Sequence, residues 1–169
     1  ISDTSINIDP PAKDLAKIAQ MTARTVKLFG LEPVIAMMSY ANFGSSKDPH
    51  ATKVKDAVSY LHRYHPDLNV DGELQADFAL NREMLQDKFP FSKLAGKKVN
   101  TLIYPNLDSA NSTYKLIKEL NNVDSIGPIM MGMRRPVHIL QLGASVEEIV
   151  NMTAVTVVDA QEKEKKQKK

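Results

Sequence analysis

The segment KVNTLIYPNLDSANSTYKLIKEL, residues 98–120, contains the clearest structural unit of the sequence. Its first part is an apolar run that ends at Pro105, which is typical of a buried strand followed by a break. A polar connection follows at residues 106–112, and residues 113–120 carry apolar side chains at helical spacing. Strand, connection and helix in this order predict one repeat of an α/β fold.

The same alternation extends in both directions along the chain. The strand-like runs are apolar and do not alternate in polarity, which is typical of a mainly parallel sheet covered by helices on both faces. Asp9 is expected to cap the first helix, and Asp48 and Pro49 to start the second. The predicted helices are residues 10–29, 51–65, 79–89, 113–120 and 145–160, and the predicted strands are residues 33–40, 69–74 (a strand and turn), 98–105, 125–132 and 136–140.

Composition narrows the possible partners. A chain of 169 residues with 43% hydrophobic content is long enough for one domain with one core. The 22 basic and 20 acidic residues leave a net charge of +2, and much of this surplus lies in the final run QEKEKKQKK, so nucleic acid is not an expected partner. No apolar run approaches the ~20 residues that cross a membrane. The absence of cysteine excludes disulfides and thiol nucleophiles and is typical of a cytoplasmic protein.

Loops that follow the predicted strands are candidate ligand sites, because ligands of parallel α/β sheets gather beyond the carboxyl ends of strands. The loop NFGSS offers Asn42, Gly44, Ser45 and Ser46. Such residues suit phosphate binding through backbone amides, although a plain turn before a helix explains the pattern nearly as well.

Two further polar features have alternative explanations. Arg134 and Arg135 precede a predicted strand, where adjacent cations could hold a phosphate or carboxylate, or could simply be solvated surface residues. The four histidines show no spacing that is typical of metal ligands, so no metal site is predicted.

The stretch QLGASVEEIV, residues 141–150, predicts a well-formed helix start. Ser145 and Glu148 have the spacing of a capping box, and the free amides of such a helix end favour anions. Gly143 would let the chain approach a ligand closely, but most capping boxes only start helices. In this last helix, buried positions are expected at Ile149, Val150, Met152 and Val157.

A set of ordered landmarks carries a family resemblance. SDTSIN, GLEPVIAMMSY, DGELQAD, YPNLDSANSTYK, IGPIMMGMRRPV and GASVEEIVN occur in this order. Read together, they resemble the C-terminal half of the phosphate acetyltransferase and butyryltransferase family. NFGSS, DGE, PNLDSAN and NMTAVTVVDAQ look closer to one branch, the phosphotransacetylase-like C-terminal domain of large bacterial NADP-dependent malic enzymes.

The resemblance implies a layered α/β fold like that of isocitrate dehydrogenases. Residues 1–161 would form the C-terminal part of the phosphate acetyltransferase-like domain, and residues 162–169 a charged tail. The chain lacks an initiator Met, and the resemblance implies that the malic-enzyme domains and the first half of the unit either lie upstream or are missing.

The resemblance also identifies positions where this chain departs from the enzymes. True phosphotransacetylases resemble S-R-G-x-S-V-x-D-I-V at this place, with Ser and Arg at the acyl phosphate and Asp as the proposed base for the thiol of coenzyme A. The corresponding residues are Gln141, Leu142 and Glu148. Leucine cannot stabilise the charge that develops during acyl transfer, so no catalytic residue is expected and transfer should be lost or very weak.

The resulting expectation is a regulatory and oligomerisation domain. It would bind acetyl-CoA as effector through Asn42, Gly44, Ser45, Ser46, Arg134, Arg135, Gln141 and Gly143. NADP and Mg or Mn would bind elsewhere in a full-length, homo-oligomeric malic enzyme. A working acyltransferase in which Arg134 or Arg135 replaces the missing arginine, and a purely structural module, remain the alternatives.

Overall fold

The computed structural model describes residues 1–121 and 125–167, with the side chains of residues 121, 166 and 167 left out. The chain divides into two compact parts, Ile1–Tyr114 and Lys115–Lys169. No helix among the described residues is long and apolar enough to span a membrane.

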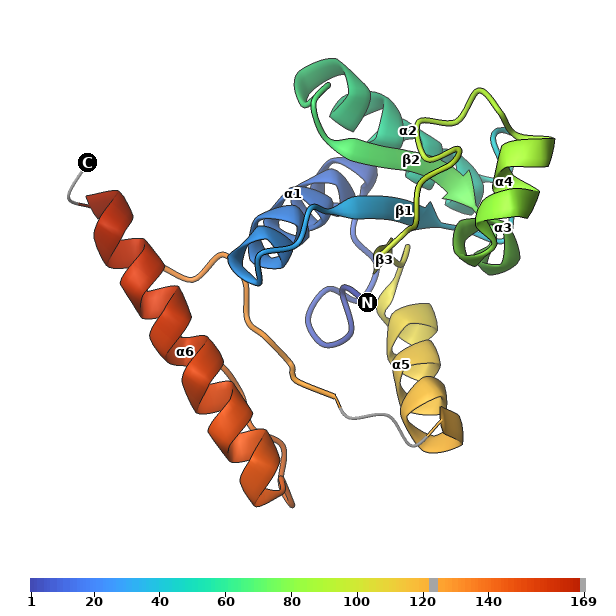
Figure 1. Cartoon of the computed structure of the whole chain (residues 1–169). Coiled ribbons are helices and arrows are strands. Elements are labelled where there is room, and N and C mark those ends of the chain that lie inside the picture. The colour runs from blue at the N-terminus through green and yellow to red at the C-terminus, as the bar shows by residue number, and fades with distance from the viewer. Residues whose placement is uncertain (122–124, 168–169) are drawn as a thin grey trace. The chain divides into compact units, whose positions relative to one another are not determined.

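The first part is built on a small parallel sheet (Figure 1). Its strands β1 (Val34–Met38), β2 (Asn69–Leu74) and β3 (Thr101–Ile103) lie in the order β2-β1-β3. Ile35 of β1 pairs with Val70 on one side and with Thr101 on the other. Successive side chains of a strand point to opposite faces, so the apolar residues of β1 contribute to the core on both sides of the sheet.

Helices cover one face of the sheet and a mixture of helices and loop covers the other. On the first face α1 (Ala12–Leu28) and α2 (Pro49–Tyr64) pack on Ile35, Met37 and Ile103. On the second face α3 (Ala76–Leu80) and α4 (Arg82–Lys88) pack with Ala36 and Met38. The predicted α/β fold, with a parallel sheet covered on both faces, is therefore confirmed.

The two predicted helix starts in this part have different outcomes. Asp48 caps α2 as predicted, since its carboxylate accepts a hydrogen bond from the His50 amide at 2.8 Å. The prediction for Asp9 is wrong, because α1 begins at Ala12 after Pro11 without a side-chain cap. The Asp9 carboxylate instead accepts a hydrogen bond from Lys53, a tertiary contact that helix signals cannot reveal.

Three element boundaries also differ from prediction. A strand and turn were predicted over residues 69–74, whereas all six residues lie within β2. The predicted helix 79–89 is divided at Asn81, whose side chain accepts from the Met84 amide at 3.0 Å and so starts a new helix. Helix α5 (Leu107–Asn121) begins inside the predicted connection, because the Asn106 side chain accepts from the Ser109 amide as a helix cap does.

The second part contains no strand among its described residues, so the strands predicted at 125–132 and 136–140 are wrong. An apolar run becomes a strand only when another strand edge pairs with it. Helix α6 (Val146–Gln167) starts as predicted and runs beyond the predicted end, so that the described part of the charged tail is helical. Met152 is buried as predicted, whereas Ile149, Val150 and Val157 are exposed.

Replacing Gly72 with alanine tests the close contact between β1 and β2. A Cβ atom at residue 72 would lie 2.6 Å from the carbonyl oxygen of Met37, and the backbone φ of Gly72 is +148°. We expect Gly72→Ala to lower the free energy of unfolding by about 3 kcal/mol in urea titrations.

Gly30→Ala is the matched control, because Gly30 has a φ of +73° but open space where its Cβ would lie. It should cost only about 1 kcal/mol. Equal losses for the two variants would contradict the steric explanation.

Candidate functional site

The candidate loop follows the carboxyl end of β1 and connects it to α2. Asn42, Gly44, Ser45 and Ser46 all lie in this one loop, which is where the sequence placed them relative to the sheet. The end of β2 and the residue after it approach the loop from the neighbouring strand, since the Ser39 amide donates to the Leu74 carbonyl at 2.8 Å. The loop and the end of β2 therefore form one polar cluster at the carboxyl edge of the sheet.

Gln75 fastens the first half of the loop. Its backbone amide donates to Asn42 Oδ1 at 2.8 Å, and its side-chain Oε1 accepts from Asn42 Nδ2 at 2.6 Å. Its Nε2 donates to the Tyr40 carbonyl at 2.7 Å. The Asn42 side chain is thus used to hold the loop on β2.

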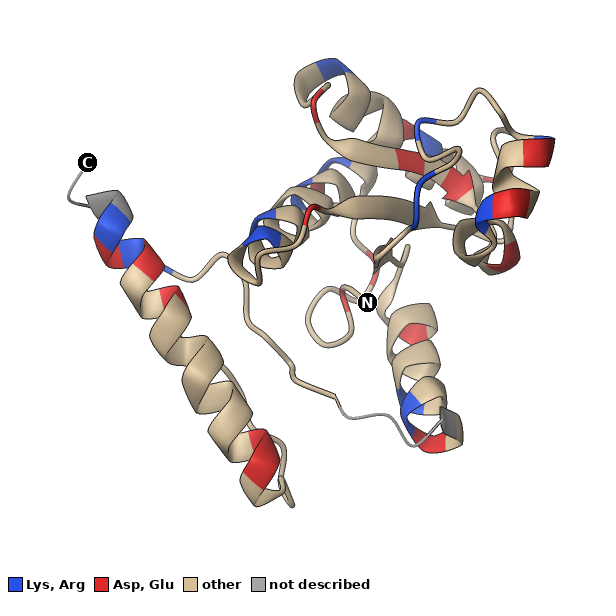
Figure 2. Ribbon diagram, in the orientation of Figure 1, with Lys and Arg blue, Asp and Glu red and all other residues tan. Residues whose placement is uncertain are grey.

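Glu73 fastens the centre of the loop. Its carbonyl accepts from the Phe43 amide at 3.0 Å, and its carboxylate Oε1 accepts from the Gly44 amide. The residue is completely buried, at 0% exposure, and Oε2 has no hydrogen-bond partner among the described residues. Acidic residues are coloured on β2 in Figure 2, whereas β1 is uncharged. A buried acidic side chain therefore lies directly behind the loop.

Four backbone amides of the loop, those of residues 42–45, already have acceptors within the protein. The Asn42 amide donates to Ser45 Oγ at 3.0 Å, and the Ser45 amide donates back to the Asn42 carbonyl at 2.9 Å. The Phe43 and Gly44 amides donate to Glu73, so the amides of residues 42–45, which a phosphate could use as donors, are all engaged. In this conformation the loop is a closed turn, and phosphate binding by Asn42, Gly44, Ser45 and Ser46 stays a prediction.

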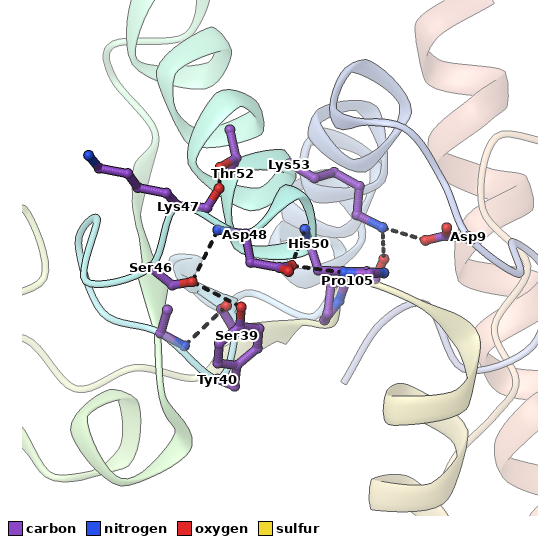
Figure 3. Close-up of polar contacts among 11 residues, drawn as sticks. Asp9, Ser39, Tyr40, Ser46, Lys47, Asp48, His50, Thr52, Lys53 and Pro105 are labelled. Carbon is purple, nitrogen blue, oxygen red and sulfur yellow. Dashed lines mark hydrogen bonds and ion pairs between the residues drawn. The ribbon is translucent and has the colours of Figure 1, made fainter.

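Lys53 connects three segments beside this loop, as Figure 3 shows. Its side chain is only 15% exposed and donates to the Asp9 carboxylate and to the Pro105 carbonyl, the latter at 2.9 Å. The hydrogen bond and charge of Lys53 hold the pKa of Asp9 below its usual value. Nearby, Ser46 Oγ lies 3.0 Å from the Tyr40 hydroxyl and accepts from the Asp48 amide at 3.1 Å. Lys53 therefore stabilises the fold around the loop.

The start of α6 forms the predicted capping box. The Glu148 amide donates to Ser145 Oγ at 3.1 Å, and the Ser145 amide donates to Glu148 Oε2 at 2.8 Å. The other carboxylate oxygen, Oε1, accepts from Lys118 at 3.2 Å. The Ser145 amide and then Lys118 lower the pKa of Glu148. Both oxygens of this carboxylate are thus in use.

The neighbouring candidates lie on the surface. Leu142 is fully exposed in the turn before α6, and Gln141 accepts a hydrogen bond from Lys115 at 3.3 Å. Arg134 and Arg135 are both exposed and follow each other in a bend. The structure brings Gln141, Gly143 and Glu148 together at one helix start.

Comparison with known proteins then identifies the family. The profile of the family described as phosphate acetyl/butaryl transferase matches residues 1–157. The chain belongs to this family. The resemblance noted from the ordered landmarks is therefore confirmed.

Relatives in the family include both kinds of protein that the sequence resembles. The chain is 41% identical over 162 residues to an NADP-dependent malic enzyme of Escherichia coli, and this match covers 95% of the chain and 21% of that enzyme. It is 42% identical over 161 residues to a phosphate acetyltransferase of Clostridium acetobutylicum, covering 95% of the chain and 48% of that protein. The chain thus spans about a fifth of one relative and about half of the other.

A solved structure from the family has the same fold. The phosphotransacetylase from Streptococcus pyogenes superposes with a TM-score of 0.89 at 42% sequence identity, over 95% of this chain and 48% of that one. The comparisons assign the family and fold, and both kinds of relative are similarly close in sequence.

Sequence reasoning missed the residues that hold the loop, namely Glu73, Gln75 and Lys53. One signal was available for Glu73, because a carboxylate within a strand of a covered sheet requires a partner when it is buried. Lys53 and Gln75 gave no such signal, since polar residues in a helix or after a strand are normally solvated.

His138 is a further buried polar residue, within the second part of the chain. Its imidazole is 2% exposed, and Nδ1 accepts from the Met130 amide at 3.1 Å. Nε2 lies 3.7 Å from the Asp159 carboxylate, which pairs with Lys163 at 2.8 Å. Burial lowers the pKa of His138 below its usual value of 6.5, against the attraction of Asp159, while Lys163 adds to the shift.

The stability of this region should depend on pH through His138. A depressed pKa means that the unfolded chain binds the proton more readily, so the stabilisation is complete above pH 6.5 and is lost as the pH falls below that value. We expect the difference in unfolding free energy between the wild type and His138→Gln to shrink from pH 7.5 to pH 5. A difference that stays constant over this range would contradict the prediction.

Proposed function

We propose that this chain is an acetyl-CoA-responsive regulatory and oligomerisation domain of a cytoplasmic NADP-dependent malic enzyme. In the full-length protein, domains outside this chain would bind NADP and Mg or Mn and convert malate to pyruvate and CO₂. The observation that carries the proposal is the state of the helix start at α6, where Leu142 is exposed and the Glu148 carboxylate acts as a cap.

Acetyl transfer to phosphate needs charge stabilisation and a base. The carbonyl oxygen becomes negative in the transition state, and loss of one donor that stabilises such a charge commonly costs ~2.7–4 kcal/mol. Leu142 offers no donor. A base should also have a pKa near the working pH, whereas the hydrogen bonds to Glu148 lower its pKa. Both features support loss of transfer in a chain that keeps the family fold.

Binding of acetyl-CoA does not require these catalytic groups. Arg134 and Arg135 are exposed and carry guanidinium groups that suit the phosphates of coenzyme A. Gln141 and Gly143 in the turn before α6, and Asn42, Gly44, Ser45 and Ser46 in the other part, are the remaining proposed contacts. The 41% identity with a malic enzyme of Escherichia coli supports the proposed context.

An active phosphate acetyltransferase is the alternative function. The 42% identity with a phosphate acetyltransferase of Clostridium acetobutylicum favours it. In that case Arg134 or Arg135 would supply the positive charge that Leu142 cannot.

A transfer assay separates the two functions. With the full-length protein, thiol release from acetyl-CoA in the presence of phosphate should be at background, and Leu142→Arg should raise it toward measurable turnover. Leu142→Lys is the matched control, because it adds charge without the bidentate geometry of arginine and should restore less. Robust turnover by the unmodified protein would establish the alternative.

Regulation is tested in the malate reaction. The rate of malate oxidation by the full-length protein should change on addition of acetyl-CoA, and substitution of both Arg134 and Arg135 by Gln should raise the concentration needed by about tenfold or more. Arg82→Gln, at an exposed position in the first turn of α4, is the control and should leave the response unchanged. No response to acetyl-CoA at any physiological concentration would leave only a structural role.

A further inference from the structure

Glu73 differs from the other buried acid of the same strand. Asp71 has a full set of donors, the Gly72 amide at 3.0 Å, Ser92 Oγ at 2.8 Å and the Lys93 amide at 2.8 Å. Glu73 is more deeply buried, yet its Oε1 accepts only the Gly44 amide and its Oε2 has no partner among the described residues. A buried carboxylate with so few donors is unfavourable in a purely structural role.

The loop that Glu73 holds is itself strained. Phe43 has a φ of +43°, which is rare for a bulky residue, and Gly44 follows with a φ of +84°. These two left-handed residues turn the Gly44 amide inward, toward the carboxylate. Glu73 stabilises this turn with two hydrogen bonds: its carbonyl accepts from the Phe43 amide, and its carboxylate accepts from the Gly44 amide. Without the carboxylate, Phe43 would gain by returning to an ordinary backbone conformation.

The Gly44 amide is also a donor that a phosphate bound at this loop would use. A carboxylate and a phosphate oxygen accept the same kind of hydrogen bond, and two negative groups cannot share one amide without repulsion. We propose that Glu73 is an internal anion that occupies the Gly44 amide in the ligand-free protein and must be displaced before a phosphate group can bind there. This inference rests on the proposed function for the identity of the ligand, the phosphates of acetyl-CoA.

The contacts around the loop suit such a switch. Gln75 holds the first half of the loop through Asn42 and the Tyr40 carbonyl, so that half can stay in place. The Phe43–Gly44 peptide can then turn outward, since glycine accepts either sign of φ. The half-buried Phe43 ring packs against Phe89 and Phe91, at ring separations of 4.9 Å and 5.0 Å, and can keep these contacts while the peptide turns. Displacing Glu73 therefore needs one peptide to turn and leaves the rest of the fold in place.

The decisive variant is Glu73→Gln, which keeps the shape and an acceptor oxygen but removes the charge. Because hydrogen bonds to a charged acceptor are about twice as strong as neutral ones, inorganic phosphate should bind the variant about tenfold more tightly. Binding is measured on the full-length protein by calorimetry with inorganic phosphate and, separately, with acetyl-CoA. Unfolding curves of both proteins check that the variant is folded.

Asp71→Asn is the matched control, since it neutralises the other buried acid of β2 and leaves the loop contacts unchanged. It should not alter the affinity for phosphate. Amide hydrogen exchange gives a second readout in the ligand-free protein. In Glu73→Gln, exchange of the Gly44 amide should be about tenfold faster and exchange of the Lys93 amide unchanged. In Asp71→Asn, exchange of the Lys93 amide should be faster and exchange of the Gly44 amide unchanged.

The outcomes separate this inference from the proposed function. Tighter phosphate binding by Glu73→Gln supports the switch even if acetyl-CoA binds neither protein, in which case the acetyl-CoA proposal fails alone. Weaker or equal phosphate binding by a folded Glu73→Gln overturns the switch, because Glu73 would then only shape the loop. Unchanged exchange at Gly44 would overturn it as well.

Discussion

The close approach of β2 to β1 is the constraint on which the rest of the first part depends. Only a residue without a side chain fits at Gly72, because the Met37 carbonyl occupies the position of a Cβ. This contact brings the end of β2 against the loop that follows β1. Glu73 and Gln75 then become the supports of that loop, and the candidate site is a consequence of strand pairing.

The two polar regions of the chain are held by opposite arrangements. At the loop after β1, the buried side chain of Glu73 accepts one hydrogen bond, from the Gly44 amide, and lies behind the candidate site. At the start of α6, the Glu148 carboxylate accepts hydrogen bonds from the Ser145 amide and from Lys118, and both lower its pKa. In both places an acidic side chain accepts a hydrogen bond from a backbone amide, Glu73 from Gly44 and Glu148 from Ser145. A fold shared with acyltransferases therefore does not by itself provide a working acid or base.

Local signals explain which elements the sequence predicted well. The start of α2 depends on Asp48 and Pro49, and the capping box of α6 on Ser145 and Glu148, all of which interact within three residues. Strand β1 was also predicted, because a long apolar run bounded by proline and polar residues has few alternatives. The strands predicted at 125–132 and 136–140 are wrong, since a strand needs a partner edge that no local pattern specifies.

The sequence by itself determined the α/β class, the helix starts with local caps, and the family. Only the tertiary structure decided what the polar residues of the first part contact. Asp9 binds Lys53 across 44 positions, and Glu73 binds the Gly44 amide across 29. The physical reason is that hydrogen bonds within one turn are set by spacing along the chain, whereas those between distant segments depend on how the strands pair.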